Sequence, residues 1–449
     1  MLADTIAAIA TPPGEGAISI IRISGPQAFP VAQKIFSRAL TRLPSHTAHY
    51  GRILSQEGET LDMVLLLLMR APRSYTGEDS VEISCHGGSL ITRRVLERAI
   101  EAGARPAQPG EFSLRAYLNG KIDLAQAEAV QQLIAAKNEL ALKTAEKQLE
   151  GALSKAIAQF QKELTETAAI LEAWVDFPEE GLEFATMEEL CANLEAIVLR
   201  MKHLQATFHN GKRLHQGISL CLLGSPNVGK SSLMNALLGK ERAIVTEIPG
   251  TTRDLLEEDL HLGPLHFRLI DTAGIRETEE IVEQEGIRRS QKAMQEADLI
   301  LLLLDATRPL SESDQTLLAA VPQKKTLLIW NKTDIRQPQH SLPWGQPIAI
   351  SAREKTGLEA LQKGIEELIW KEGPPSKEEI VITRQRHATA LAHAIASLET
   401  VIEGLQRNVS AEFVTSDIRN ALNELGTIIG TNVTEEILSA IFSKFCLGK

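Results

Sequence analysis

The sequence predicts a multidomain chain of mixed α+β and α/β class, because three different residue patterns divide it. Short strand-like runs, turn signals and helical stretches mix in residues 1–119, and helical patterns rich in Ala, Glu, Gln and Leu fill residues 120–215 and 376–449. Residues 216–375 alternate strands with helices, which predicts a mostly parallel sheet. A length of 449 residues suits about three domains of ~150 residues each.

The first domain, residues 1–119, is predicted to be α+β. Residues 17–23, 64–69 and 81–85 are apolar or alternating runs of strand length. The turn signals Ser24-Gly25-Pro26 and His86-Gly87-Gly88 end two of these runs.

Two helical segments flank the α/β segment. In the first, Ala125, Ala129 and Leu133 recur at the spacing of a helix face, and in the second the apolar residues recur at steps of three and four: Leu391, Ile395, Leu398, Ile402 and Leu405. Because the two ends of a domain often lie close together, we expect the helical segments to form one domain with residues 216–375 inserted into it.

Composition excludes several classes of protein. Hydrophobic residues make up 43% and charged residues 23%, as in globular proteins, and no apolar run approaches the ~20 residues of a membrane span. The first residues lack the basic region of a signal peptide, and the 4 cysteines show no C-x-x-C pair. We therefore expect a cytoplasmic protein without a membrane segment. A net charge of −11 argues against non-specific DNA coating but does not exclude RNA.

Residues 224–231 fit the phosphate-binding pattern G-x-x-x-x-G-K-[ST]. A strand is expected before them at 218–223 and a helix after them at 232–238, which is the context this loop requires. Lys230 would contact the β- and γ-phosphates, and the Ser231 hydroxyl would bind Mg²⁺. The predicted phosphate contacts in this loop are Asn227, Val228, Gly229, Lys230, Ser231 and Ser232.

A second signal, Asp271-Thr272-Ala273-Gly274, follows a predicted strand end at 267–270. The Asp271 carboxylate can hold a metal-bound water, and the Gly274 N–H can contact a γ-phosphate and respond to its loss.

The third signal, Asn331-Lys332-Thr333-Asp334, predicts guanine recognition. A carboxylate at Asp334 can accept two hydrogen bonds from guanine, from N1–H and from the exocyclic amine. Adenine offers no such pair of donors, so Asp334 would select GTP over ATP. Ser351, Ala352 and Arg353 follow another apolar run and would close the base pocket.

The fourth signal lies between the first two, where a threonine must reach Mg²⁺ and the γ-phosphate. We assign Thr252 to Mg²⁺, and the segment expected to contact the nucleotide is Thr246, Glu247, Ile248, Pro249, Gly250, Thr251 and Thr252. The four signals in this order predict a Ras-like, translation-factor-class GTPase domain.

The expected hydrolytic machinery is unusual. Ras-like GTPases place a water-orienting glutamine directly after D-x-x-G, whereas this chain has Ile275 there. The next segment contains several glutamates, and the residues alone do not select one of them. A monovalent cation could replace an arginine finger, held by the Asn227 side chain and by carbonyls of residues 246–252.

Further motifs lie along the whole chain, outside the GTPase signals: Asp4-Thr5-Ile6, Ala10-Thr11-Pro12-Pro13-Gly14, Arg22-Ile23-Ser24-Gly25, Tyr75-Thr76-Gly77-Glu78-Asp79, His86-Gly87-Gly88, Pro109-Gly110-Glu111-Phe112, Lys121-Ile122-Asp123-Leu124-Ala125-Gln126-Ala127-Glu128 and Phe445-Cys446-Leu447-Gly448-Lys449. In these motifs the chain resembles the tRNA uridine-5-carboxymethylaminomethyl modification GTPase family MnmE, also called TrmE.

The resemblance implies a homodimer whose N-terminal domain binds tetrahydrofolate and mediates dimerisation. It implies that the chain acts with the FAD-dependent partner MnmG (GidA) to install a carboxymethylaminomethyl or aminomethyl group on C5 of wobble uridine 34 of certain tRNAs. The one-carbon unit would come from 5-formyl- or 5,10-methylene-tetrahydrofolate. Hydrolysis of GTP would be stimulated by K⁺ when two GTPase domains meet. The sequence has no dinucleotide fingerprint, so a flavin would belong to the partner.

The resemblance also assigns roles to individual residues. K⁺ would be bound by Asn227, Thr246, Ile248 and Thr251, and Mg²⁺ by Ser231 and Thr252. Glu283 matches the catalytic glutamate of the family, and folate contacts would fall on Arg22, Glu82, Lys121 and Lys449. Cys446 is a candidate catalytic or tRNA-proximal thiol in a C-terminal segment where the family usually has Ile in place of Leu447.

Two other functions remain open from the sequence. A ribosome-assembly GTPase would bind rRNA, commonly through a KH domain with a G-x-x-G loop, and residues 376–449 contain no such motif because Gly426 and Gly430 are one residue too far apart. A nucleotide-dependent scaffold without hydrolysis would explain Ile275.

Overall fold

The structure is a computed structural model that describes residues 4–41, 43–176, 186–239, 259–263, 265–270, 293–338, 342–370, 379–407 and 409–449. The chain forms two compact units. The first unit comprises Met1–Ile134, Ala145–Gln205 and Arg386–Lys449, and the second unit comprises Ala135–Thr144 and Ala206–Gln385.

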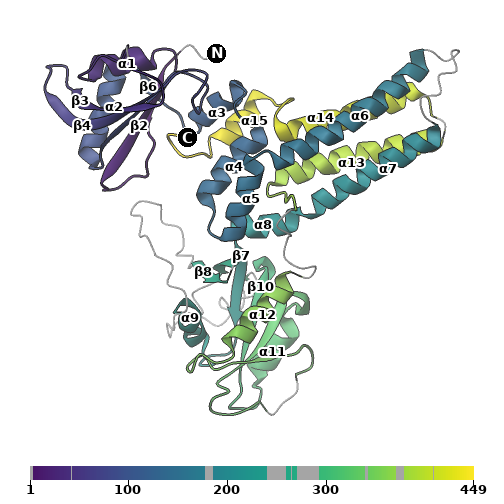
Figure 1. Ribbon diagram of the computed structural model, residues 1–449. Coiled ribbons are helices and arrows are strands. Elements are labelled where there is room, and N and C mark those ends of the chain that lie inside the picture. Colours follow the sequence, from purple (N-terminus) through teal and green to yellow (C-terminus); the bar gives the residue numbers. More distant parts are fainter. Residues whose placement is uncertain are drawn as a thin grey trace. The chain divides into compact units, whose positions relative to one another are not determined.

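The first unit contains a mixed sheet of strand order β3-β4-β5-β2-β1-β6 (Figure 1). Its elements are β1 (Ile6–Ile9), β2 (Ile18–Ser24), α1 (Ala28–Ile35), β3 (Thr47–Leu54), β4 (Thr60–Met69), β5 (Ser80–His86), α2 (Ser89–Glu101) and β6 (Arg105–Pro106). The three predicted strands are confirmed. Helices α1 and α2 share a hydrophobic core with one face of this sheet.

Strand β4 is apolar on both of its faces. Leu66 and Leu68 point into the core, whereas Met63 and Leu65 on the other face are 39% and 50% exposed. Because side chains alternate along a strand, this explains why the sequence shows a continuous apolar run here. We call the side of the sheet away from α1 and α2 the outer face.

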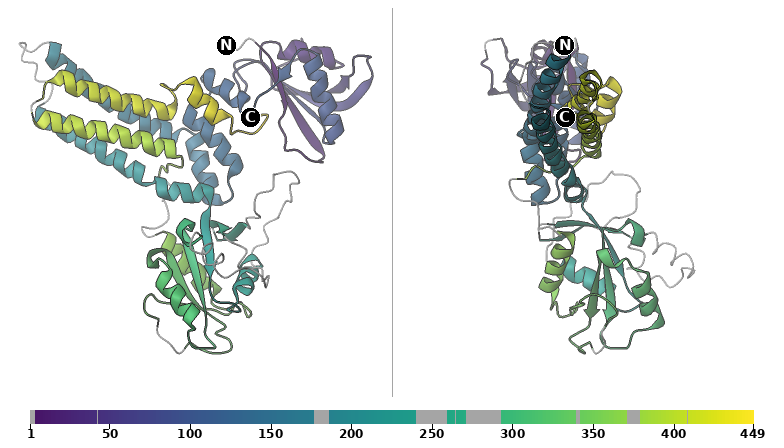
Figure 2. Two further views of the ribbon diagram at one scale, coloured as in Figure 1. Left: turned by 180° about the vertical axis from the view of Figure 1, so that it is seen from behind. Right: turned by 90° about the vertical axis from the view of Figure 1, so that its right-hand side faces the viewer.

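The helical part of the first unit is built from both sides of the α/β segment. Its helices are α3 (Glu111–Leu118), α4 (Leu124–Ala135), α5 (Glu139–Leu149), α6 (Ala152–Asp176), α7 (Met187–Ala206), α13 (Gln385–Gln406), α14 (Ala411–Ile429) and α15 (Glu435–Phe442), of which α4, α5, α7 and α13 extend into the second unit at one end. Helices α6 and α14 lie side by side (Figure 2). The predicted apolar seam of α13 is confirmed, since Leu391, Leu398 and Leu405 are buried.

A buried ion-pair cluster fastens the start of α13 to α4. The Arg386 guanidinium donates to both oxygens of Glu128 at 2.8 and 2.7 Å, and His387 Nε2 lies 2.9 Å from the same carboxylate. Arg386 also donates to the last carbonyls of α14, at Thr427 and Ile428. Burial alone would raise the pKa of Glu128, but His387 and Arg386 hold this pKa well below its usual value.

The second unit contains a sheet of strand order β12-β11-β10-β7-β9-β8 that is parallel except for the β8–β9 pair. Its elements are α8 (Phe208–Gln216), β7 (Ile218–Leu223), α9 (Lys230–Leu238), β8 (Asp259–Leu262), β9 (Leu265–Ile270), β10 (Leu299–Asp305), α11 (Glu312–Ala320), η2 (Gln323–Lys325), β11 (Thr326–Asn331), β12 (Ile348–Ala349) and α12 (Leu358–Ile369). The sequence predicted this parallel α/β fold correctly.

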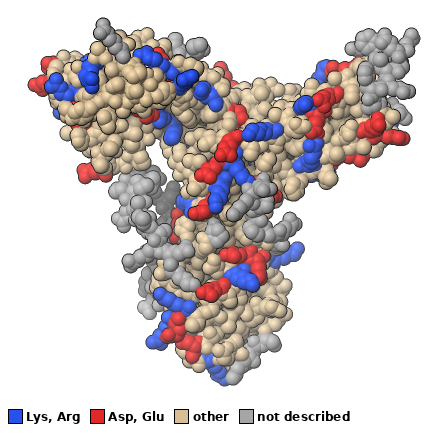
Figure 3. All heavy atoms as spheres, viewed as in Figure 1, with Lys and Arg blue, Asp and Glu red and all other residues tan. Residues whose placement is uncertain are grey.

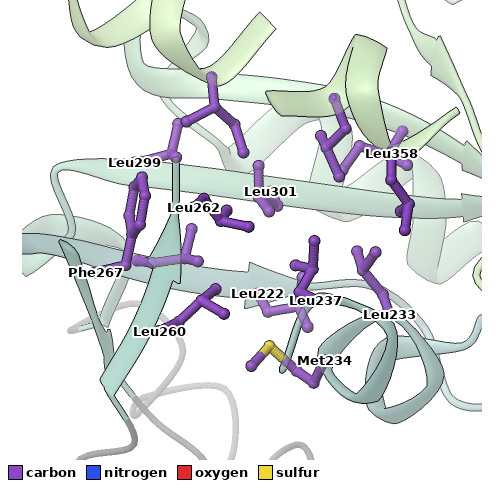
Figure 4. Packing of buried hydrophobic residues seen from close by; sticks show 14 of the residues in the cluster. Leu222, Leu233, Met234, Leu237, Leu260, Leu262, Phe267, Leu299, Leu301 and Leu358 are labelled. Atoms are coloured by element: carbon purple, nitrogen blue, oxygen red, sulfur yellow. The ribbon is translucent and has the colours of Figure 1, made fainter. Parts of the chain in front are cut away.

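The hydrophobic core of the second unit packs its strands against α9, and so determines the edge at which the strands end and the loops begin. Leu222 of β7 and Leu301 of β10 pack with Leu233 and Met234 of α9, as Figure 4 shows. The carboxyl ends of parallel strands lie at one edge of a sheet, where ligands bind in α/β folds. The turns after β7, β10 and β11 therefore meet at that edge.

Two further features of the described residues are their hydropathy and the distribution of their charges. No helix among them is long and apolar enough to cross a membrane. On the face that Figure 3 shows, Lys and Arg side chains are interspersed with Asp and Glu.

Candidate functional site

The loop between β7 and α9 has the backbone of a phosphate cradle. Gly224 and Gly229 have φ of +153° and +99°, and Asn227 has φ of +62°. The Lys230 ammonium donates to the carbonyls of Gly224 and Ser225 at 2.8 and 3.0 Å. Lys230 thus folds over its own loop, where the ammonium is placed to meet a phosphate.

Two residues after β11 hold this loop in place. Asn331 Nδ2 donates to the Val228 carbonyl at 2.8 Å, and Lys332 Nζ donates to the Asn227 carbonyl at 2.7 Å. Asn331 packs so closely against Gly229 that a Cβ added at Gly229 would lie 2.3 Å from Asn331 Nδ2. The predicted phosphate loop and the predicted guanine segment are therefore hydrogen-bonded to each other.

The same asparagine reaches the third predicted segment. Its Oδ1 accepts a hydrogen bond from the Ala352 N–H at 3.0 Å. Ser351 is fully buried and its hydroxyl accepts from the Glu354 N–H at 3.1 Å, while Asp334 and Arg353 are exposed. Asn331 joins three loops at the carboxyl edge of the sheet, beside the exposed Asp334 carboxylate.

The sequence reasoning missed two aspartates that support the site. Asp305, at the end of β10, accepts from Lys332 Nζ at 2.7 Å, and Asp314 accepts from the Ser225 hydroxyl at 2.5 Å. Burial alone would raise the pKa of Asp305, but hydrogen bonds from Lys332 and Thr307 hold it below its usual value. One available signal was that Asp305 directly follows the apolar run 299–304.

Twelve of the thirty sequence-predicted site residues lie outside the described residues. Those outside are Thr246, Glu247, Ile248, Pro249, Gly250, Thr251, Thr252, Asp271, Thr272, Ala273, Gly274 and Glu283. Of the others, Ser231 and Ser232 lie in the first turn of α9, and the Thr333 N–H donates to the Ile350 carbonyl at 3.2 Å.

Three of the four predicted folate residues come together in the first unit. Arg22 of β2 lies opposite Glu82 of β5 and donates to its carboxylate at 2.9 Å, and Arg22 Nη1 donates to the Gly448 carbonyl at 3.0 Å. The Arg22 guanidinium and the Lys449 ammonium lie 5.7 and 6.0 Å from the centre of the Tyr75 ring. The C-terminal residues are thus seated on the outer face of the sheet.

The charges around this cluster influence Lys449. Burial lowers the pKa of its ammonium, and the neighbouring Arg22 charge lowers it further. Two cations beside a tyrosine ring suit a ligand that combines a planar ring with carboxylates.

Cys446 contacts the cluster through its backbone, because its carbonyl accepts from the Lys449 N–H at 3.3 Å, whereas Lys121 makes no recorded contact with the cluster. The Lys121 ammonium donates to the Pro72 carbonyl at 3.1 Å, at the start of the segment that carries Tyr75. Cys446 is exposed, and its carbonyl accepts from Gly110 N–H at 3.4 Å.

Comparison with known proteins covers the whole chain. The family model described as "GTP-binding protein TrmE N-terminus" matches residues 5–121, and the one described as "MnmE helical domain" matches residues 124–446. Proteins named tRNA modification GTPase MnmE are similar over their full length. That of Protochlamydia amoebophila is 63% identical over 99% of this chain and 98% of its own. That of Chlamydia abortus is 46% identical over 99% of both chains, and that of Lachnoclostridium phytofermentans is 45% identical over 100% of both. The phosphate loop bound to a guanine-type segment agrees with these matches, and the chain belongs to the tRNA modification GTPase MnmE family.

Proposed function

We propose that this chain is a K⁺-stimulated GTP hydrolase that, with the FAD-dependent partner MnmG, modifies C5 of wobble uridine 34 of certain tRNAs with a folate one-carbon unit. Family membership makes it a tRNA modification GTPase. The single observation that carries the nucleotide part is the pair of hydrogen bonds from Asn331 and Lys332 to the phosphate loop, three and two residues before Asp334.

Selection of GTP follows from that arrangement. Asn331 and Lys332 fix the segment to the phosphate loop, so a nucleotide seated in the loop brings its base to Asp334. The Asp334 carboxylate has no hydrogen-bond donor in the described structure, so it is available to the two donors of guanine. A mismatched base leaves this acceptor unpaired, at a cost of about 1–3 kcal/mol.

The described part of the cation site fits the proposal. Asn227 is exposed, its carbonyl is fixed by Lys332, and its side-chain amide has no partner among the described residues. An amide oxygen is a suitable ligand for a hard cation. Asn227 with Thr246, Ile248 and Thr251 would hold K⁺, which would supply positive charge beside the phosphates. Ser231 and Thr252 would hold Mg²⁺, and Glu283 would orient the water that Ile275 does not.

The folate proposal rests on the cluster of Arg22, Glu82 and Lys449. The two cations would bind folate carboxylates or carbonyls, and Glu82 would accept from the donor edge of the pterin. Lys121, whose ammonium donates to the Pro72 carbonyl in the segment that carries Tyr75, would be a further cation for the folate carboxylates. A bound 5-formyl- or 5,10-methylene-tetrahydrofolate would supply the one-carbon unit, and Cys446 is the nearby exposed thiol.

The homodimer is proposed to form through the outer face of the sheet. Ile18, Tyr50 and Leu65 are 62%, 59% and 50% exposed there, and Tyr50 lies directly opposite Leu65 in the β3–β4 register. Exposed apolar side chains that adjoin on one sheet face are typical of an interface. A second copy would cover them, next to the cluster at Arg22.

The alternative, a ribosome-assembly GTPase that binds rRNA through a G-x-x-G loop, gains no support. Gly426 lies inside α14 and Gly430 is the residue after its last turn, so neither forms an exposed loop of the KH type.

Nucleoside analysis tests the tRNA assignment. Depletion of the chain from its cell should remove the C5 modification from wobble uridines, and an Asp334→Ala copy should not restore it. Normal wobble uridines together with accumulating precursor rRNA would instead favour the ribosome-assembly function.

A further inference from the structure

A cavity of about 370 Å³ lies in the second unit, at the sheet edge opposite the phosphate loop. It is lined by residues that directly precede or begin the strands: Arg213 from α8, Asp298 and Leu299 at the start of β10, and Lys324 and Lys325 in front of β11. The phosphate loop follows the other end of β7. The cavity is therefore separate from the nucleotide site, and its volume is within the range of small-molecule pockets.

Its polar side is cationic. Three basic side chains face one carboxylate, Asp298, whose Oδ2 accepts from the Ser219 hydroxyl and N–H at 2.6 and 3.1 Å. Arg213 Nε lies 3.7 Å from Asp298 Oδ1, so the guanidinium is only loosely paired. The Lys325 ammonium is held by the carbonyls of Gln295 and Ala297 at 3.1 and 2.7 Å. Lys324 is exposed and has no partner among the described residues. An anion would thus meet a fixed ammonium, a free ammonium and a guanidinium.

The other side of the cavity is apolar. Leu368 and Ile369 come from the last turn of α12, Trp370 follows directly, and Leu299 lies at the foot of β10. Trp370 is 7% exposed, so its ring is held in place by its surroundings. Such a wall suits a flat, apolar body, whereas a free inorganic anion would leave it unused.

We propose that this cavity binds a small organic anion, whose ring contacts Trp370 and Leu368 and whose phosphate or carboxylate lies between Arg213 and Lys324. All of these residues belong to the second unit. The ligand would contact α8 and the last turn of α12.

Pyridoxal 5′-phosphate is a direct probe, because it has an aromatic ring, a phosphate and an aldehyde. The Lys324 amine adds to the aldehyde and loses water to give an imine, and borohydride reduces the imine to a stable secondary amine. Mass spectrometry of the intact chain's peptides then measures labelling at each lysine. We expect labelling of Lys324 to saturate with probe concentration and to exceed that of Lys363, an exposed lysine of α12 outside the cavity.

A matched pair of variants on α8 supplies the control. Arg213→Gln should weaken the labelling of Lys324 by roughly tenfold, as expected for loss of one charged contact. Lys212→Gln removes the same charge from an exposed neighbour that does not line the cavity, and should leave the labelling unchanged. Inorganic phosphate should compete if the site prefers a phosphate, and benzoate should compete if it prefers a carboxylate.

Three results would overturn the proposal. Labelling of Lys324 that rises linearly with probe and matches Lys363 would show that no site exists. Equal effects of the two α8 variants would show a general charge effect. Protection of Lys324 by GDP would show that the probe reports on the nucleotide site.

Discussion

At the scale of single residues, Asp334 is proposed to determine which base is bound. Replacing it with Asn exchanges one acceptor oxygen for an amide donor, which matches the O2 of xanthine instead of the amine of guanine. We expect Asp334→Asn to bind GTP about 10- to 100-fold more weakly and to bind xanthosine triphosphate instead. Calorimetric titration with both nucleotides measures this. Equal loss of both affinities would mean that Asp334 supports the fold and does not read the base.

Some residues of the candidate site could be identified from the sequence, and others could not. Asn331, Lys332 and Ser351 could be identified because their chemistry is tied to short motifs. Asp305 and Asp314 could not, because their partners Lys332 and Ser225 are 27 and 89 positions away along the chain. Contacts of that kind follow from strand order, which the sequence does not state. The position of Lys449 beside Arg22 likewise depends on where the C-terminal segment docks.

At the scale of secondary-structure elements, Glu128 joins α4 to α13. Glu128→Ala leaves Arg386 and His387 without their shared anion in a buried place, and we expect a loss of about 3 kcal/mol in unfolding free energy of the helical part. Urea unfolding followed by helical circular dichroism measures it. Glu172→Ala breaks the exposed pair with Arg419 and should cost less than about 1 kcal/mol. Similar losses in the two variants would contradict the role given to burial.

The contribution of Glu128 to the stability of the folded chain depends on pH. The pKa of Glu128 is lower in the folded chain than its ordinary value of 4.5. Its contribution is therefore complete above about pH 4.5 and is lost as the pH falls below that value, because only the unfolded chain then takes up the proton. The stability of Glu128→Ala should fall less steeply over this acid range than that of the native chain.

Most of the secondary-structure elements discussed could be predicted from the sequence. Runs of strand length and helical spacing located β2, β4, β5, β7 and α13, because local periodicity is the signal that determines them. The ends of elements differed by a few residues, as for β4, which begins at Thr60 where the sequence analysis placed a strand start at residue 64. The outer face of the first sheet was not foreseen, since an unbroken apolar run does not show which side lies open.

At the scale of the whole molecule, the outer face should hold two chains together. Leu65→Lys places a charge in the middle of the proposed interface, beside Tyr50, and should convert the dimer to a monomer in sedimentation experiments. Leu199→Lys alters a 70% exposed leucine of α7 in the helical part and should leave the dimer intact. A dimer that survives Leu65→Lys would place the interface elsewhere.

The central claim is that this chain hydrolyses GTP by a cation-activated mechanism assisted by Glu283. The most direct measurement is the GTP turnover of the purified chain in KCl and in NaCl at equal ionic strength, with Glu283→Ala alongside. We expect turnover in KCl to be faster by on the order of 10-fold or more, since a cation beside the phosphates replaces an arginine finger, and to be lost in the variant. Slow turnover that is equal in the two salts and unchanged by Glu283→Ala would contradict the account.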